Sequence, residues 1–180
     1  LPYRYTESTS EGLLLLPGSF NPVHQGHKEM LRTAEKITGE NGAFELSIKN
    51  AEKPSLDYIT LTDRLEQMNQ YPVWLTNTAT FTEKSRLFQN SVFAVGIDTI
   101  KRIGEVRFYN NDPTLMAESL KELSSNGVKF LVFGRLQGKH FESMQDLSLP
   151  DDLLFLCESV PEDIFRSDLS SSQLREEDSK

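Results

Sequence analysis

Several kinds of residue are scarce in this 180-residue sequence, and each scarcity excludes a class of protein. The single cysteine, Cys157, allows no disulfide within the chain. The longest apolar run, Leu13–Leu16, is far too short to span a bilayer. Acidic residues outnumber basic ones by 27 to 19, and the net charge of −8 argues against a general polyanion binder, which needs basic stripes. We therefore expect neither a nucleic-acid partner nor a membrane partner.

The length and the composition are those of one globular domain. Hydrophobic residues make up 37% of the chain and charged residues 26%, which is ordinary for a folded domain of this size. Residues 1–12 are polar, and we predict that they form a mobile leader before a single domain at 13–180. The residues before Leu13 do not resemble a signal peptide, so we expect a cytoplasmic protein, or a nuclear one in a eukaryote.

Short apolar runs alternate with stretches of helical spacing along the chain. Leu13–Leu16 is typical of a strand buried on both faces, whereas Phe44 and Leu46 alternate with polar residues. The patterns predict strands at 13–16, 44–48, 73–75, 91–95, 128–133 and 153–156, and helices at 25–38, 57–70, 114–124 and 170–177. Strands separated by helices predict an α/β fold with an open, mostly parallel sheet and helices on both faces. Ligands of such sheets bind beyond the carboxyl ends of the strands, so the loop after Leu16 is the first candidate site.

That loop contains two of the three histidines in the chain. Gly18 permits a tight exit from the strand and a close approach of the backbone to a ligand. His24 lies just before the predicted helix and His27 in its first turn, where free N–H groups and the helix dipole favour an anion. At this spacing both imidazoles can donate to one phosphoryl group. The alternatives are a zinc site, for which no nearby cysteine or carboxylate completes a ligand set, and a capping or core role for each histidine.

The stretch Gly18-Ser-Phe-Asn-Pro-x-His24-x-Gly26-His27 resembles the HxGH signature of the nucleotidylyltransferase superfamily, including its Gly-x-Phe-x-Pro lead-in. The resemblance implies a Rossmann-like domain that begins with this strand, loop and helix. It also implies that catalytic histidines contact a nucleoside triphosphate and stabilise charge at its α-phosphate. The residues implied are Gly18, Ser19, Phe20, His24, Gly26 and His27 at the phosphates and Asn21 at the second substrate.

A second stretch, Leu169–Arg175, resembles the Ile-Ser-Ser-Thr-x-x-Arg signature of the same superfamily, with Leu for Ile and Ser for Thr. Serines at a helix N-terminus supply hydroxyl and backbone donors, and Arg175 adds a fixed charge. Taken alone, this run indicates a capped terminal helix. The resemblance implies instead that Ser170, Ser171, Ser172 and the catalytic Arg175 hold the outgoing pyrophosphate.

Weaker stretches bear on the acceptor. Lys53-Pro54-x-Leu56, followed by Arg64, resembles a stretch of nicotinamide and nicotinate mononucleotide adenylyltransferases. Trp74 falls where those enzymes often have a tryptophan, and Thr80-Phe81-Thr82 is similar to their Tyr-Thr segment. The resemblance implies acceptor contacts from Lys53, Arg64, Trp74, Phe81 and Thr82, with aromatic rings stacked on a pyridine. The alternative, that Trp74 and Phe81 are core residues, stays open.

Two further stretches bear on the nucleoside. Val95-Gly96-Ile97-Asp98 resembles the Gly-x-Asp of the superfamily, which implies that nucleotide approaches Gly96 and that Asp98 accepts from a ribose hydroxyl. Phe133-Gly134-Arg135 is similar to a strand end that borders the adenine, which implies nucleotide contacts from Gly134 and Arg135. The alternatives are a helix cap at Asp98 and a surface arginine on a turn.

The overall resemblance covers roughly residues 13–176 and is closest to pyridine mononucleotide adenylyltransferase-like proteins of a divergent plant and fungal group. It implies an enzyme that moves AMP from ATP to the 5′-phosphate of nicotinamide or nicotinate mononucleotide by direct in-line attack and releases pyrophosphate. The implied partners are ATP and a small phosphorylated acceptor, and the implied cofactor is Mg²⁺, bridged by phosphate oxygens with few protein ligands. The alternatives are a CTP-dependent or phosphopantetheine-type transferase and a catalytically silent nucleotide-binding domain. We also predict that the histidines and nearby basic residues form a small cationic pocket within an acidic shell.

Overall fold

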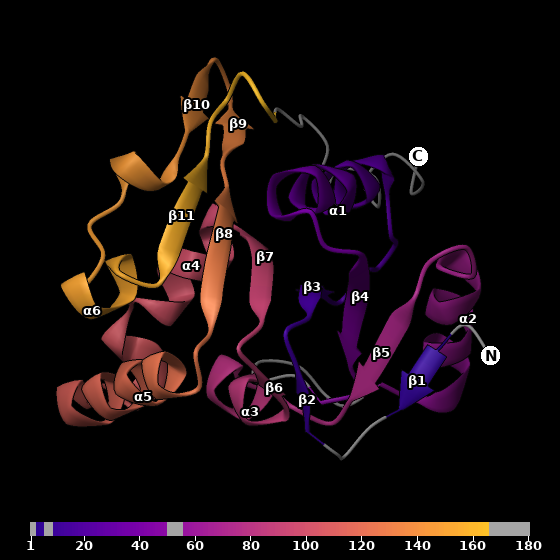
Figure 1. Ribbon diagram of the computed structural model, residues 1–180, viewed down its shortest axis with the longest axis horizontal. Coiled ribbons are helices and arrows are strands. Elements are labelled where there is room, and N and C mark those ends of the chain that lie inside the picture. Colours follow the sequence, from indigo (N-terminus) through magenta and orange to yellow (C-terminus); the bar gives the residue numbers. More distant parts are fainter. Residues whose placement is uncertain (1–2, 6–8, 50–55, 166–180) are drawn as a thin grey trace.

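A parallel sheet of seven strands runs through the centre of the molecule, in the order β1-β5-β4-β3-β7-β8-β11 (Figure 1). The computed structural model describes residues 3–5, 9–49 and 56–165. Neighbouring strands of this sheet are parallel. The strands are β1 (Tyr3–Tyr5), β3 (Leu14–Gly18), β4 (Gly42–Ser47), β5 (Val73–Thr76), β7 (Val92–Gly96), β8 (Lys129–Phe133) and β11 (Cys157–Val160). The predicted α/β fold with a mostly parallel sheet is confirmed.

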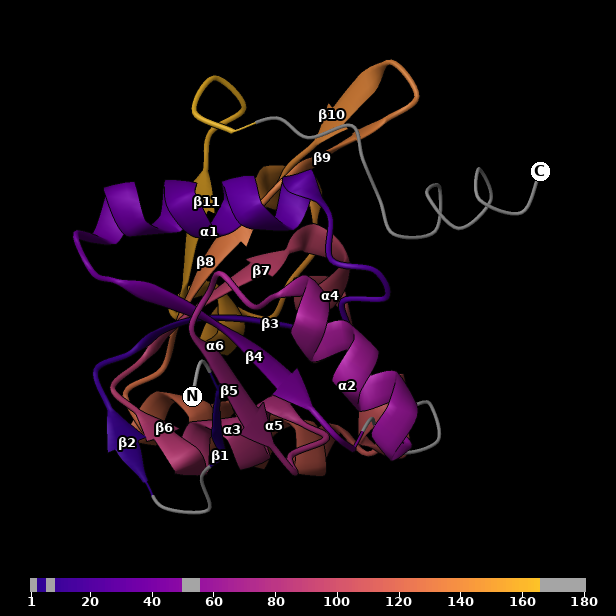
Figure 2. The ribbon, with the colours of Figure 1, turned by 90° about the vertical axis from the view of Figure 1, so that its right-hand side faces the viewer.

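Helices cover both faces of this sheet (Figure 2). They are α1 (Gln25–Thr38), α2 (Tyr58–Gln67), α3 (Phe81–Leu87), α4 (Ile97–Ile103), α5 (Pro113–Ser125) and α6 (Asp151–Leu154), with 3-10 turns η1 (Val106–Tyr109) and η2 (Met144–Asp146). One core, which contains Leu14 and Leu31, lies under α1 and α2. A second core on the other face contains Leu15 and Ile100. Adjacent leucines of β3 therefore face opposite cores, which is why its sequence is continuously apolar.

Helix α1 begins and ends where the local sequence predicts. His24 is its N-cap residue in an extended conformation. Gly39 ends the helix at a φ of 75°, and its N–H donates to the carbonyl of Glu35 at 2.8 Å. A left-handed backbone of this kind favours glycine, which confirms the predicted C-terminal stop.

The strand predicted at 153–156 is wrong. Residues Asp151–Leu154 form the short helix α6, and the last strand of the sheet begins only at Cys157. Leu153 and Leu156 are buried while Leu154 and Phe155 are exposed, which is the three-residue spacing of a helical turn. A run of four apolar residues carries no periodicity of its own, and the two aspartates that precede it favour a helix N-terminus.

Regular structure also occurs where none was expected. In the segment expected to be a mobile leader, Tyr3–Tyr5 pairs with β5 at the edge of the sheet, and β2 (Ser10–Glu11) pairs with β6 (Phe88–Gln89). A hairpin of β9 (Arg135–Gln137) and β10 (His140–Glu142) projects beyond the end of β8 (Figure 2). Within the described residues, no helix has the length and apolar character that a membrane span requires.

Candidate active site

A cavity of about 910 Å³ lies at the carboxyl ends of the central strands. The chain builds β4 and β5 on one side of β3 and then crosses to build β7, β8 and β11 on the other side. Strand order therefore reverses beside β3, and the loop after β3 lines the cavity at that point. The location predicted from the fold class agrees with this geometry.

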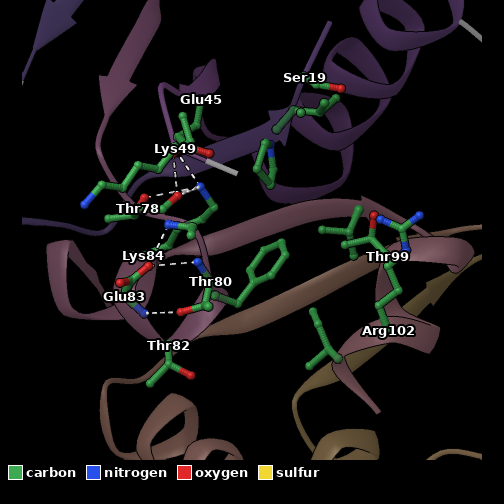
Figure 3. Close-up of a pocket in the computed structure, with 18 of the residues that line it drawn as sticks. Ser19, Glu45, Lys49, Thr78, Thr80, Thr82, Glu83, Lys84, Thr99 and Arg102 are labelled. Atoms are coloured by element: carbon green, nitrogen blue, oxygen red, sulfur yellow. Dashed lines mark hydrogen bonds and ion pairs between the residues drawn. The ribbon is translucent and has the colours of Figure 1, made fainter. Parts of the chain in front are cut away.

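The cavity has two sides, which Figure 3 shows on opposite sides of the view. The β4 side contains Glu45, Ser47, Lys49, Thr78 and Lys84, and the β7 side contains Gly96, Asp98, Thr99 and Arg102. Among the described residues that line the cavity, five are basic (Lys49, Arg64, Lys84, Arg86 and Arg102) and three are acidic (Glu45, Glu83 and Asp98). This lining has the opposite sign to the whole chain, whose net charge is −8. It favours an anionic ligand.

The loop after β3 is anchored by Phe20. Its side chain is buried, and its ring packs edge-on against Phe44 at 4.9 Å and against His27 at 5.1 Å between centroids. A Cβ at Gly18 would lie 2.8 Å from the Phe20 ring, so the loop needs glycine there. Arg64 of α2 braces the same loop from outside, since its Nη1 donates to the carbonyl of Ser19 at 2.7 Å. Gly18, Ser19, Phe20, Asn21 and Arg64 all line the cavity.

The two histidines form one unit at the start of α1. The backbone N–H of His24 donates to Nδ1 of His27 at 3.2 Å, and the two rings stack with centroids 3.7 Å apart. Because Nδ1 of His27 accepts this hydrogen bond, the proton of the neutral ring belongs on Nε2. His27 lines the cavity, whereas His24 and the buried Gly26 are not among its lining residues.

The protonation of these rings differs from the sequence prediction. Burial, together with the neighbouring His24, lowers the pKa of His27 to about 3, and burial lowers the pKa of His24. Both imidazoles are therefore neutral near pH 7, and the expectation that the histidines add to a cationic pocket is wrong. Each neutral ring keeps one N–H group that can donate, and the positive charge of the lining comes from lysine and arginine.

The β4 side carries a buried network that the sequence patterns did not indicate. Glu45 is fully buried, and its Oε1 accepts from Lys84 Nζ at 2.8 Å and from the hydroxyl of Thr76. Lys84 also donates to the carbonyl and the hydroxyl of Thr78 at 3.1 and 3.3 Å. In the sequence Glu45 stands between the apolar residues Phe44 and Leu46, and this alternation indicated a strand with one exposed face. In the structure, helix α3 covers the face that carries Glu45. The sequence signal for this helix was the capping pattern Thr80-Phe-Thr-Glu83 at its N-terminus.

Two of the residues predicted to contact the nucleoside line the cavity, and the other two lie at the start of the β9–β10 hairpin. Gly96 and Asp98 line the cavity at the start of α4. Asp98 forms an ion pair with Arg135 at 2.6 Å, and both side chains are about half exposed. A Cβ at Gly134 would lie 2.5 Å from the ring of Phe141 and 2.6 Å from a backbone oxygen, so this glycine lets the β9–β10 hairpin close against β8. Gly134 and Arg135 are not among the residues that line the cavity.

The predicted acceptor contacts divide in a similar way. Phe81 and Thr82 line the cavity at the start of α3, and the Phe81 ring also packs edge-on against Phe93 at 5.5 Å. Trp74 is not among the lining residues, and its ring packs edge-on against Phe88 at 5.6 Å between centroids. The remaining predicted residues, Lys53, Ser170, Ser171, Ser172 and Arg175, lie outside the described residues.

Comparison with known proteins agrees with this architecture. Residues 15–177 match the family described as Cytidylyltransferase-like, a segment that includes both histidines and the stretch 169–175. No curated protein matches the sequence. The match spans most of the chain and begins in β3, the strand that carries the histidine loop. The chain therefore belongs to the cytidylyltransferase-like family of HxGH nucleotidyltransferases.

Proposed function

We propose that this protein transfers AMP from ATP to the 5′-phosphate of a pyridine mononucleotide and releases pyrophosphate. The observation that carries the proposal is the placement of His27, whose Nε2–H group is available at the start of α1, where the order of the strands reverses. Family membership supports nucleotidyl transfer in general. The choice of ATP and of a pyridine acceptor rests on the motif resemblances and on the chemistry of the two sides of the cavity.

The donor triphosphate lies, in this proposal, between the histidine loop and the β7 side. Backbone N–H groups of Gly18–Phe20 and the neutral ring of His27 hold the α- and β-phosphates. Gly96 allows the nucleoside to approach the backbone, and Asp98 accepts from a ribose hydroxyl while it remains paired with Arg135. Ser170–Ser172 and Arg175 hold the β- and γ-phosphates, as the second signature implies.

The acceptor lies on the β4 side, so that its phosphate meets the α-phosphate at the loop after β3. Arg64 and Lys49, which line the cavity, supply positive charge for the acceptor phosphate. Lys53 adds to it, as the resemblance to the mononucleotide adenylyltransferases implies. We assign the aromatic contact with the pyridine ring to Phe81, which lines the cavity, since Trp74 packs into the core. Thr82 lies beside Phe81 on the same turn.

The proposed reaction is a single in-line displacement. An oxygen of the acceptor phosphate forms a bond to the α-phosphorus, and the bond from that phosphorus to the bridging oxygen breaks as pyrophosphate leaves. The attacking phosphate is already an anion at neutral pH, so no general base is needed. Catalysis then consists of positioning two anions and stabilising the charge that gathers on the α-phosphate oxygens, which is the task of the His27 Nε2–H donor.

Magnesium is the expected cofactor of this reaction. Within the described residues, no three His, Cys, Asp or Glu side chains gather as a metal cage. This lining fits an ion that is held mainly through substrate phosphates, with few protein ligands. When bound, the ion would neutralise charge on the phosphate oxygens.

Pyrophosphate release tests the proposal directly. The purified protein would be incubated with Mg²⁺ and either ATP or CTP, together with one acceptor from a panel of nicotinamide mononucleotide, nicotinate mononucleotide, phosphopantetheine and glycerol phosphate. We expect release with ATP and at least one pyridine mononucleotide. Release only with CTP or with phosphopantetheine would favour the alternative transferases. If no acceptor in the panel leads to pyrophosphate release, the result would favour a silent nucleotide-binding domain.

A further inference from the structure

Four polar side chains form a buried cluster on the β4 side of the cavity: Glu45, Thr76, Thr78 and Lys84, here called the Glu45 cluster. Figure 3 labels three of them, Glu45, Thr78 and Lys84. Glu45 is fully buried and Lys84 is 6% exposed. Glu45, Thr78 and Lys84 line the cavity. The cluster therefore belongs to the cavity wall and yet is closed off from bulk water.

Counting protons shows which atoms of the cluster remain available. Lys84 has three protons, and they are accepted by Glu45 Oε1, by the carbonyl of Thr78 and by the hydroxyl of Thr78. The hydroxyl of Thr76 donates to Glu45 Oε1, which leaves the Thr78 hydroxyl to donate to Thr76 over 2.8 Å. Every donor in the cluster is therefore used, so Lys84 has no proton left for an anionic ligand.

The remaining atom is an acceptor. Glu45 Oε2 is buried and has no hydrogen-bond partner among the described residues. A buried carboxylate oxygen without a donor is costly, and native structures rarely keep one that no ligand or water satisfies. The ion pair with Lys84 removes the net charge of the cluster but leaves this oxygen unsatisfied. A group that enters the β4 side beside Glu45 can satisfy this oxygen only if it brings a donor to it.

The position of Glu45 links this requirement to the acceptor. Glu45 is paired with Pro17 in the β3–β4 register, next to the strand end at which the histidine loop begins. In Figure 3 it lies away from Thr99 and Arg102 of the β7 side, where we place the nucleoside of the donor. An ionised phosphate cannot donate a hydrogen bond, so an acceptor group that satisfies Glu45 Oε2 is distinct from the phosphate that reacts.

We propose that Glu45 determines acceptor specificity: its Oε2 accepts a hydrogen bond from an uncharged donor on the acceptor base and excludes a carboxylate from the same position. For a pyridine mononucleotide the matching group is the carboxamide N–H of the nicotinamide form, and the rejected group is the carboxylate of the nicotinate form. This inference rests on the proposed function. A site that must receive a hydrogen bond discriminates strongly against analogues that cannot donate, and like charges add to the exclusion.

The first test compares three acceptors that differ only at the ring substituent, with ATP and the wild-type protein. The acceptors are the mononucleotides of nicotinamide, nicotinate and 3-acetylpyridine. The acetyl substituent of the last is uncharged but has no N–H donor. We expect kcat/KM to be about 100-fold or more higher for the carboxamide than for either of the others. Equal use of carboxamide and carboxylate would overturn the inference and leave the proposed function intact, whereas no turnover of any acceptor would overturn both.

The second test uses Glu45→Gln. The glutamine Oε1 can still accept from Lys84 and Thr76, while its Nε2 replaces Oε2 with a donor. We expect the preference for the carboxamide to fall by about 30-fold or more, chiefly through better use of the carboxylate. The matched control is Glu118→Gln, a change of the same charge at an exposed residue of α5 outside the cavity lining, which should keep the wild-type preference.

Thermal unfolding shows whether Glu45→Gln folds. If it does not, the three-acceptor comparison with the wild-type protein decides alone, since it requires no variant. A folded Glu45→Gln protein with the same preference as Glu118→Gln would overturn the inference even if the wild-type protein favours the carboxamide.

Discussion

Replacing His27 by asparagine separates the two tasks that the structure gives to this side chain. Nδ1 of His27 accepts from the backbone N–H of His24 at 3.2 Å, and Nε2–H is the donor that we assign to the phosphates. The asparagine Oδ1 can replace Nδ1 as an acceptor, but asparagine has no group at the position of Nε2. His27→Asn should therefore keep the start of α1 and lose the donor.

The expected magnitudes follow from these contacts. Loss of one preorganised donor to a transition state costs about 3 kcal/mol, so kcat should fall by about 10² to 10³-fold. The lost contacts of the ring with Phe20 and His24 should lower the free energy of unfolding by about 1 kcal/mol, which is only a few degrees in Tm. The KM for ATP should change much less than kcat, since the donor acts chiefly in the transition state.

The assay is steady-state pyrophosphate release with saturating ATP and acceptor, with thermal unfolding measured on the same preparations. His27→Gln is the control, because glutamine places an amide donor near the position of Nε2 and should retain more activity than asparagine. A folded His27→Asn protein with a kcat close to that of the wild type would refute the catalytic role of His27. Equal losses in both variants would show that the imidazole ring itself, rather than its donor, is required.

Four further predictions concern stability, packing and binding. The pKa of His27 is lowered from 6.5 to about 3, so below pH 6.5 the unfolded chain binds a proton that the folded protein does not. The free energy of unfolding should therefore fall by about 5 kcal/mol between pH 6.5 and pH 3. Acid unfolding of His27→Asn should lack this part of the pH dependence. Trp74→Phe should lower the free energy of unfolding by about 1–3 kcal/mol in chemical denaturation, with the acceptor KM unchanged, since Trp74 packs against Phe88; a large rise in KM would return Trp74 to the acceptor site. Gly134→Ala should cost about 1–3 kcal/mol by the same measurement, because its Cβ would meet Phe141, and unchanged stability would contradict that contact. Arg175→Ala should weaken ATP binding in calorimetry by about tenfold or more, and an unchanged Kd would contradict its place at the pyrophosphate.

Local sequence predicted most of the framework. The apolar run at Leu13–Leu16, the helical spacing after Gln25 and the stop at Gly39 each depend on neighbouring residues, and the structure confirms all three. The helices α3 and α4 were not predicted, because seven residues are too few to display a helical period.

The histidine site was predicted because its parts are adjacent in the sequence. Gly18, Phe20 and His27 lie within one loop and the first turn of one helix, so a motif can specify them. The partners that complete the site come from far along the chain. Arg64 lies 45 residues from the carbonyl it contacts, and Lys84 lies 39 residues from Glu45. No local pattern records such pairs.

The sequence by itself determined the α/β class, the position of the histidine loop after the first predicted strand and the family, since these follow from apolar periodicity and from a contiguous motif. The tertiary structure decided the burial of particular groups and, through burial, their chemistry. Covering His27 makes it a neutral donor instead of a cation, and covering Glu45 with α3 turns a polar strand residue into an acceptor in the cavity wall. Desolvation depends on what the rest of the chain places above a side chain, so it exists only in the folded molecule.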